Sequence, residues 1–184
     1  MPVYEFEGKR PRVAKNAFVY PEATIIGDVF IGEGCYIGPG ARIRGDWGAV
    51  VIGSYSNIQE NCIIHSAPAV VTHLASRSHI GHGSILHGPV LDEHVVVGMG
   101  AIIMDSVTIG SGCFIGAGAL ITAGTVIPPQ RLYMGIPARD CGAVSDKMAK
   151  YLEYATSIYM ELPQRCLNGL QEIDFKDVIV NPKT

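Results

Sequence analysis

Three histidines have the side-chain type and the spacing needed to bind a metal ion: His65, His82 and His87. All six histidines of the chain lie between residues 65 and 94, and chance does not produce such a cluster in 184 residues. Three imidazoles that leave a fourth position open to water form the usual catalytic zinc site, and the same ligands suit Fe(II) or Co(II). The sequence therefore predicts a metal site, with simple packing at a subunit interface as the alternative.

Four other polar residues precede these histidines in the chain. Arg44 and Asp46 have opposite charges and could pair across a subunit interface. Asn57 and Gln59 flank Ile58, so both amides point away from the side on which the isoleucine is buried. An amide beside a metal-bound hydroxide can orient it by hydrogen bonding. Solvated side chains on a protein face would explain these four residues equally well.

A six-residue repeat determines where these residues lie. Aliphatic residues recur at this interval from Val19 to Ile43, from Ile52 to Ile64 and from Leu91 to Ile127, with a small or branched residue two positions before most of them. Two inward positions in each hexad are what a short strand provides, because side chains alternate between its faces. A period of six does not match the α-helix. The pattern predicts an all-β fold, a parallel β-helix with about 18 residues in each coil.

The repeat also predicts which histidines meet. His65 and His87 each follow an inward aliphatic residue and are 22 positions apart (87 − 65), which is one coil of about 18 residues plus about four more. The segment from Ser66 to Ser78 breaks the repeat, so the extra residues can bulge there. His65 and His87 would then stack on one face, about 4.8 Å apart. His82 lies nearer a corner, from which it would reach a neighbouring subunit, so a threefold assembly would hold three such sites.

The chain divides into three parts. We expect residues 1–142 to form the β-helix domain with the metal site, residues 143–175 to form a C-terminal helix that packs on it, and residues 176–184 to be a frayed tail. Ser145 is a suitable N-cap for the helix. From Met148 to Leu162, apolar residues recur three and four apart and predict an amphipathic helix, interrupted or restarted near Pro163. Its apolar stripe should pack against the β-helix or a neighbouring subunit.

Composition narrows the classes of partner. The net charge is −3 and the basic residues do not cluster, which disfavours nucleic acid. No stretch of about 18 apolar residues could span a membrane, and the first residues lack the features of a signal peptide. Five scattered cysteines without a C-x-x-C motif indicate a reduced, cytoplasmic protein, with Cys35, Cys62 and Cys113 as small core residues. Only 17% of residues are charged, so we expect another subunit to cover part of the surface.

Three motifs resemble a known family. The segments R-G-D, N-I-Q-E-N-C-I-I-H and G-H-G-S-I-L-H-G, which begin at Arg44, Asn57 and Gly81, are similar to those of the gamma-class carbonic anhydrase superfamily. Residues 1 to 175 as a whole most resemble its phenylacetate-degradation and carnitine-operon branch. The resemblance implies a left-handed β-helix and a homotrimer, with zinc, or Fe(II) or Co(II), bound between subunits.

The resemblance also implies roles for individual residues. His65, His82 and His87 correspond to the metal ligands of the superfamily. Gln59 corresponds to a glutamine near metal-bound water, and Asn57 to a second polar residue of the site. The remaining matches are the pair Arg44 and Asp46, which would shape the site at the interface, and Tyr133, which would approach it.

Four functions are open at this point. The resemblance first implies reversible CO₂ hydration by a metal-bound hydroxide. However, the segment from Ser66 to Ala75 contains no carboxylate that could shuttle protons as the acidic loop of the archetypal enzyme does. The second function is hydrolysis of an acyl-CoA thioester at the same site. The third is acyl transfer to a small acceptor with one histidine as base and no metal, as in other hexapeptide-repeat proteins. The fourth is a non-catalytic accessory role.

Overall fold

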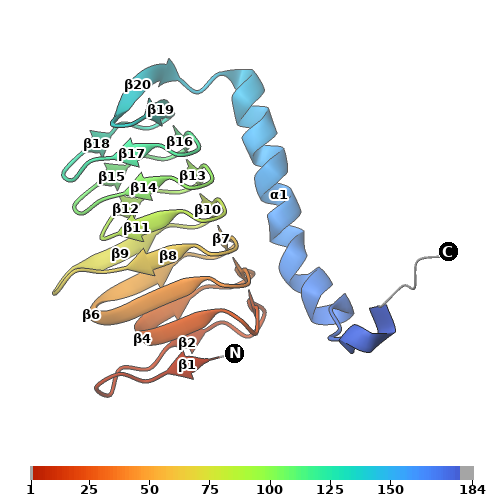
Figure 1. Cartoon of the computed structure of the whole chain (residues 1–184). Coiled ribbons are helices and arrows are strands. Elements are labelled where there is room, and N and C mark those ends of the chain that lie inside the picture. Colours follow the sequence, from red (N-terminus) through yellow and green to blue (C-terminus); the bar gives the residue numbers. More distant parts are fainter. Residues whose placement is uncertain (1, 179–184) are drawn as a thin grey trace.

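The chain folds into a parallel β-helix with one long α-helix beside it (Figure 1). The computed structural model describes residues 2–178. Strands stack coil upon coil because the inward aliphatic residues of successive coils pair in register. Ile103, for example, lies between Leu86 and Ile121. The β-helix predicted from the six-residue repeat is confirmed.

The first face of the β-helix belongs to an eight-stranded sheet. Its strands run parallel except the last, which turns back against its neighbour. In stacking order they are β3 (Phe18–Val19), β5 (Tyr36–Ile37), β7 (Asn57–Ile58), β10 (His79–Ile80), β13 (Val96–Val97), β16 (Phe114–Ile115), β19 (Arg131–Gly135) and β20 (Ala138–Ala143).

The second and third faces are joined into one twelve-stranded sheet, because two long strands, β4 (Thr24–Ile31) and β6 (Arg42–Ile52), run around the corner between them. At the N-terminal end, β1 (Val3–Tyr4) and β2 (Arg12–Val13) pair with β4. Beyond β6, the second face contains β8 (Ile63–His65), β11 (Ile85–His87), β14 (Ile102–Ile103) and β17 (Leu120–Ile121). The third face contains β9 (Val71–Leu74), β12 (Val90–Leu91), β15 (Thr108–Ile109) and β18 (Val126–Ile127).

The core is a column of aliphatic and small side chains enclosed by the three faces. Ile64, Leu86 and Ile103 have no exposed surface. Cys35 and Cys62 lie among them, and burial raises the pKa of each thiol to about 11. These two cysteines, and Cys113 in the same core, are small core residues, as predicted.

The break in the repeat is shorter than the sequence analysis predicted. Strand β9 lies within the segment from Ser66 to Ser78, and its Leu74 is a fully buried core residue. Thr72, two positions earlier, fills the small inward position of that hexad. The extra residues therefore bulge only at the corner from Ser66 to Val70, between β8 and β9.

The helix α1 (Asp146–Gly169) runs back along the first face towards the N-terminal coils (Figure 1). Ser145 caps it by accepting a hydrogen bond from the backbone NH of Met148, as predicted. The predicted interruption at Pro163 is wrong, because the helix continues through this residue. The predicted apolar stripe also differs from the buried face, since Tyr151 is largely exposed while Thr156 is fully buried.

A 3₁₀ turn covers Phe175–Val178, so the start of the predicted frayed tail is ordered, and residues 179–184 of that tail lie outside the described residues. Among residues 2–178, no helix is both long enough and apolar enough to cross a membrane. The cytoplasmic location stays a prediction.

Candidate functional site

His65 and His87 form an imidazole pair on the second face. They end strands β8 and β11 and are direct partners in the parallel register, so the stacking predicted from the four-residue excess is confirmed. The ring centroids lie 5.0 Å apart, and Nδ1 of His65 is 3.1 Å from Nε2 of His87. These two nitrogens converge on one small volume.

A carboxylate lies at the other nitrogen of each ring. Nε2 of His65 is 2.9 Å from Oδ1 of Asp46, and Nδ1 of His87 is 2.6 Å from Oδ1 of Asp105. Since a carboxylate accepts hydrogen bonds, these contacts place the protons on the outer nitrogens and leave the two facing nitrogens with lone pairs. The sequence analysis did not predict Asp105 as a site residue, although it lies 18 positions after His87, one coil further on.

Arg44 and Asp46 pair within one chain. The predicted pairing across an interface is therefore not required, because a guanidinium nitrogen of Arg44 already binds Oδ2 of Asp46. Partial burial opposes ionisation of Asp46, but hydrogen bonds from His65, Arg44 and the backbone NH of Trp47 outweigh it and lower the pKa of this carboxyl to about 2. Asp46 is thus a fixed anion that orients His65.

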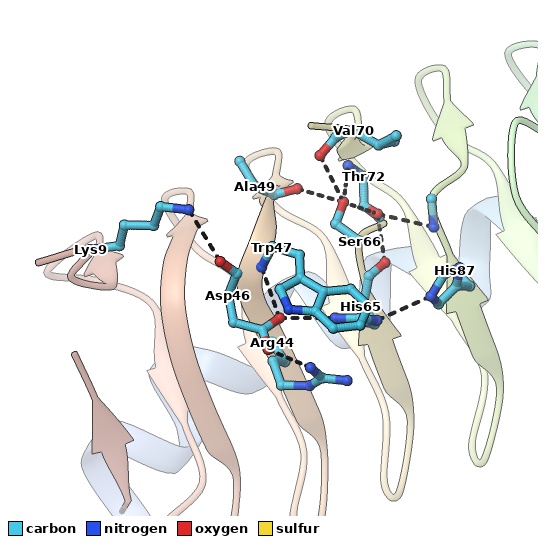
Figure 2. A network of polar contacts seen from close by, with 11 residues as sticks. Lys9, Arg44, Asp46, Trp47, Ala49, His65, Ser66, Val70, Thr72 and His87 are labelled. Carbon is cyan, nitrogen blue, oxygen red and sulfur yellow. Dashed lines mark hydrogen bonds and ion pairs between the residues drawn. The ribbon is translucent and has the colours of Figure 1, made fainter. Parts of the chain in front are cut away.

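The single tryptophan of the chain, Trp47, covers His65 from one side (Figure 2). The indole of Trp47 lies 5.7 Å from the ring of His65, centroid to centroid, although the residue is 58% exposed. Lys9 donates a hydrogen bond of 3.1 Å to the backbone carbonyl of Asp46 and so secures the corner that carries both residues. An exposed aromatic side chain held beside a polar site is suited to contact a ligand or a second subunit.

Buried hydroxyl groups hold the strand end that carries His65. Thr72 donates a hydrogen bond of 2.7 Å to the carbonyl of His65 and accepts one of 3.2 Å from the backbone NH of Gly88. Ser66 donates to the carbonyl of Ala49 at 2.9 Å, across the corner. Figure 2 shows this network above His65. The backbone at His65 and at Gly88, next to His87, is therefore held by buried side chains.

A second cluster lies on the first face, under α1. Nε2 of Gln59 is 2.9 Å from Oδ1 of Asn57 and 2.7 Å from Nε2 of His79, whose Nδ1 is 3.2 Å from Nδ2 of Asn57. The ring of Tyr159 from α1 closes the cluster at 5.1 Å, edge to face with His79. Burial, with smaller effects of His82 and His94, lowers the pKa of His79 to about 4, so its ring is neutral near pH 7.

His82 lies at the corner that follows β10. A carboxylate oxygen of Glu60 binds its Nδ1, and Glu60 also accepts a hydrogen bond of 3.2 Å from the hydroxyl of Tyr36. The imidazole is 45% exposed, and within residues 2–178 no group bonds to its Nε2. His82 thus has one nitrogen held by an anion and the other open to a ligand.

His82 and the second cluster line a groove between the first face and α1, which we call the α1 groove. Its volume is about 290 Å³. The lining residues are Gln59, His79, Gly81, His82, Val96, Val97, Gly98, Met99, Phe114, Ala117, Tyr151, Leu152, Ala155 and Tyr159.

The structure divides the residues predicted for one site into two groups. The imidazole pair, Arg44 and Asp46 lie together on the second face, whereas Asn57, Gln59 and His82 lie on or beside the first. Tyr133 belongs to neither group, because it is on β19, three strands from β10.

His94 faces α1. Its Nε2 lies 3.4 Å from a carboxylate oxygen of Glu153.

Part of this arrangement fits a metal ion. The facing lone pairs of the imidazole pair are at a separation that two ligands of one ion can have, and carboxylates at the outer nitrogens are usual partners of metal-bound histidines. Two imidazoles do not complete a site, however. Within residues 2–178 of one chain, no three His, Cys, Asp or Glu side chains gather around a common point that could hold a metal.

A β-helix built from six-residue repeats is the architecture of a hexapeptide-repeat protein. The pattern of the family described as bacterial transferase hexapeptide (six repeats) matches residues 10–45 and 88–123. The carnitine operon protein CaiE of Escherichia coli (strain K12) is 41% identical over 172 residues, 94% of this chain and 88% of that protein. The chain belongs to this hexapeptide-repeat family, in the carnitine-operon branch that the sequence motifs indicated.

Two solved structures share both fold and sequence. A putative acetyltransferase from Bacillus cereus is 36% identical, with a TM-score of 0.86 over 88% of this chain and 94% of that one. A hexapeptide transferase family protein from Anaplasma phagocytophilum is 32% identical, with a TM-score of 0.83 over 89% and 96%.

These likenesses correct the first function drawn from the sequence. The prediction of a carbonic anhydrase-like metalloenzyme is wrong, because the relatives carry the names of carnitine operon proteins and of transferases. Thioester hydrolysis, the second function, has no support among them. The motifs around the histidines therefore identified the branch correctly but not the reaction.

Proposed function

We propose that the protein is an acyltransferase that moves an acyl group from a thioester to a small acceptor, with His82 as general base. One observation carries the proposal: the imidazole of His82, which lines the α1 groove, is held at Nδ1 by Glu60, and its Nε2 has no bonded partner within residues 2–178. The name of the Bacillus cereus relative, putative acetyltransferase, supports this reaction class.

The geometry of His82 suits each proton transfer of the reaction. A neutral ring with its proton on Nδ1 accepts a proton at Nε2 from the amine or hydroxyl of the acceptor. At the same time, the nitrogen or oxygen of the acceptor forms a bond to the acyl carbon. The bond from the acyl carbon to sulfur then breaks, and the thiolate takes the proton from the imidazolium. Glu60 fixes the tautomer and stabilises the imidazolium between the two transfers.

The test is transfer from acetyl-CoA to a panel of small amines and alcohols. Release of free thiol and the mass of the acetylated product would be measured together, so that hydrolysis is distinguished from transfer. We expect His82→Asn to lower the rate by about 10²–10⁴-fold, the usual contribution of a general base. His73→Asn, on β9 of the third face, serves as the matched control. Full activity of His82→Asn, or no acylated product with any acceptor, would refute the proposal.

We also propose a homotrimer. Ile63, Ile85 and Ile102 form an exposed column on the second face, 44%, 37% and 40% exposed, since the three residues pair in register through β8, β11 and β14. An unbroken apolar column of this kind is expected to be covered by another copy. Light scattering coupled to size exclusion would measure the mass. A monomeric mass at working concentration would count against the trimer, and Ile85→Glu should dissociate it.

The predicted metal remains a separate proposal. Its ligands would be His65 and His87, whose facing nitrogens lie 3.1 Å apart, and His82 of the partner subunit. The chemistry that such a metal supplies when bound is Lewis acidity. Metal analysis of protein purified without oxygen, with His87→Ala as control, tests binding alone. If the acetyl transfer persists with a chelator and still requires His82, the role of His82 as base is supported over its role as a ligand.

A further inference from the structure

The shape and lining of the α1 groove indicate which kind of acyl group could bind there, which the proposed reaction does not specify. Its long wall is apolar: Val96, Met99 and Phe114 come from the first face, and Leu152 and Ala155 from α1. His82 lies at one end, and the lining continues to the coil of β16, two coils further on. At about 4.8 Å for each coil, this stretch is roughly 10 Å long.

The lining is also uncharged. Among the described residues that line it, none is Lys, Arg, Asp or Glu, and the buried ring of His79 is neutral near pH 7. Burial of an ionised group without a partner is costly, so the groove disfavours charged ligands over neutral ones. A neutral, elongated group is therefore the best match to its surface.

The volume indicates how large a group the groove can hold. About 290 Å³ corresponds to roughly ten water molecules at ~30 Å³ each. The two-carbon chain of an acetyl group would leave most of the apolar wall in contact with water. Each further methylene that enters the groove gains about fourfold in affinity, if it is fully buried.

We propose that the α1 groove binds the acyl chain of the donor, and that this chain is an apolar group of about four to eight carbons rather than acetyl. The proposal rests on the proposed acyl transfer for its orientation, with the thioester at His82 and the chain along α1. Ala117 is the specificity-determining residue at the far end, where a larger side chain would shorten the groove.

The test uses S-ethyl, S-butyl and S-hexyl coenzyme A, thioethers that cannot react, with binding measured by titration calorimetry. For the wild-type protein we expect the affinity to rise by about tenfold or more from ethyl to hexyl. Ala117→Leu should remove that rise and leave the ethyl compound within about twofold. The matched control is Ala123→Leu, because Ala123 also precedes a glycine with positive φ at a corner but does not line the groove.

The outcomes test acyl-chain binding in the groove independently of the proposed acyl transfer. A chain-length effect that Ala117→Leu removes supports the groove, whether or not any acylated product forms in the transfer assay. Equal affinity for the three thioethers, no binding of any of them, or the same loss in Ala123→Leu would overturn it. Failure of acyl transfer with length-dependent binding intact would instead refute only the proposed function.

Discussion

The buried ring of His79 should make the stability of the protein depend on pH. In the folded chain its pKa is about 4, against 6.5 for a free histidine. As the pH falls below 6.5 the unfolded state takes up a proton that the folded state does not, so stability is full above 6.5 and is lost progressively down to about 4. At 1.36 kcal/mol for each pKa unit, a shift of about 2.5 units amounts to about 3 kcal/mol.

Other groups with shifted pKa values also make the free energy of unfolding depend on pH, some in the same pH range as His79 and some below it. His94 also has a lowered pKa, mainly through burial, so it adds to the loss of stability on acidification. The carboxyl of Asp46, with its pKa lowered from 3.8 to about 2, stabilises the fold above 3.8, and that contribution is lost only at lower pH. The effect of His79 must therefore be isolated by a variant rather than read from the wild-type curve alone.

The assay is urea unfolding of wild type and His79→Gln at pH 7.0, 5.5 and 4.5, at one protein concentration. Glutamine is neutral and can still hydrogen-bond Asn57 and Gln59, so the variant removes the titration while keeping a polar partner. Between pH 7.0 and 4.5 we expect wild type to lose about 2–3 kcal/mol more than the variant. His73→Gln, on the third face, should follow the wild-type curve. Parallel curves for wild type and His79→Gln would refute the assignment of a neutral buried ring.

Three further changes test the packing around the candidate site. Gly48→Ala should destabilise the fold by about 1–3 kcal/mol, because its Cβ would overlap the carbonyl oxygens of Ala67 and Val70, whereas Gly169→Ala on α1 meets open space and should not lower the melting temperature. Thr72→Val should cost about 1–3 kcal/mol in urea unfolding, since the loss of its hydroxyl leaves buried backbone groups with one partner fewer. Arg77→Ala breaks an exposed ion pair with α1, so we expect a loss of at most about 1 kcal/mol, and a larger one would show that the pair anchors the helix.

The repeat made the fold and one contact predictable. Inward positions six apart define the coil, and the number of residues in excess of one coil predicts that His65 lies beside His87, which the strand register confirms. The six-residue pattern did not predict β9. The corner at 66–70 has an irregular length, so the pattern that resumes at Leu74 is out of step with the hexads before it. A hexad specifies which side chains are inside, but it does not specify the path of an irregular corner.

The partners of the histidines were harder to predict for a related reason. Asp105 and Glu60 contact His87 and His82 from neighbouring coils, and nothing in a single hexad marks an outward carboxylate as a partner rather than a solvated group. The reaction was harder still. Motifs around His65 and His82 are shared by proteins of one fold, and fold similarity does not fix chemistry.

The antiparallel pairing of β20 with β19 determines which strand edge is exposed at the C-terminal end of the first face. A stack of parallel coils has no intrinsic last member, since each strand offers unpaired backbone groups to the next. At the C-terminal end of the first face, the next strand comes from the same chain and in the opposite direction, so it does not offer the register of another coil. A chain that stopped before Ala138 would leave β19 uncovered and able to template a second molecule. On the first face, the hairpin therefore covers the edge of β19 on which another parallel coil would pair.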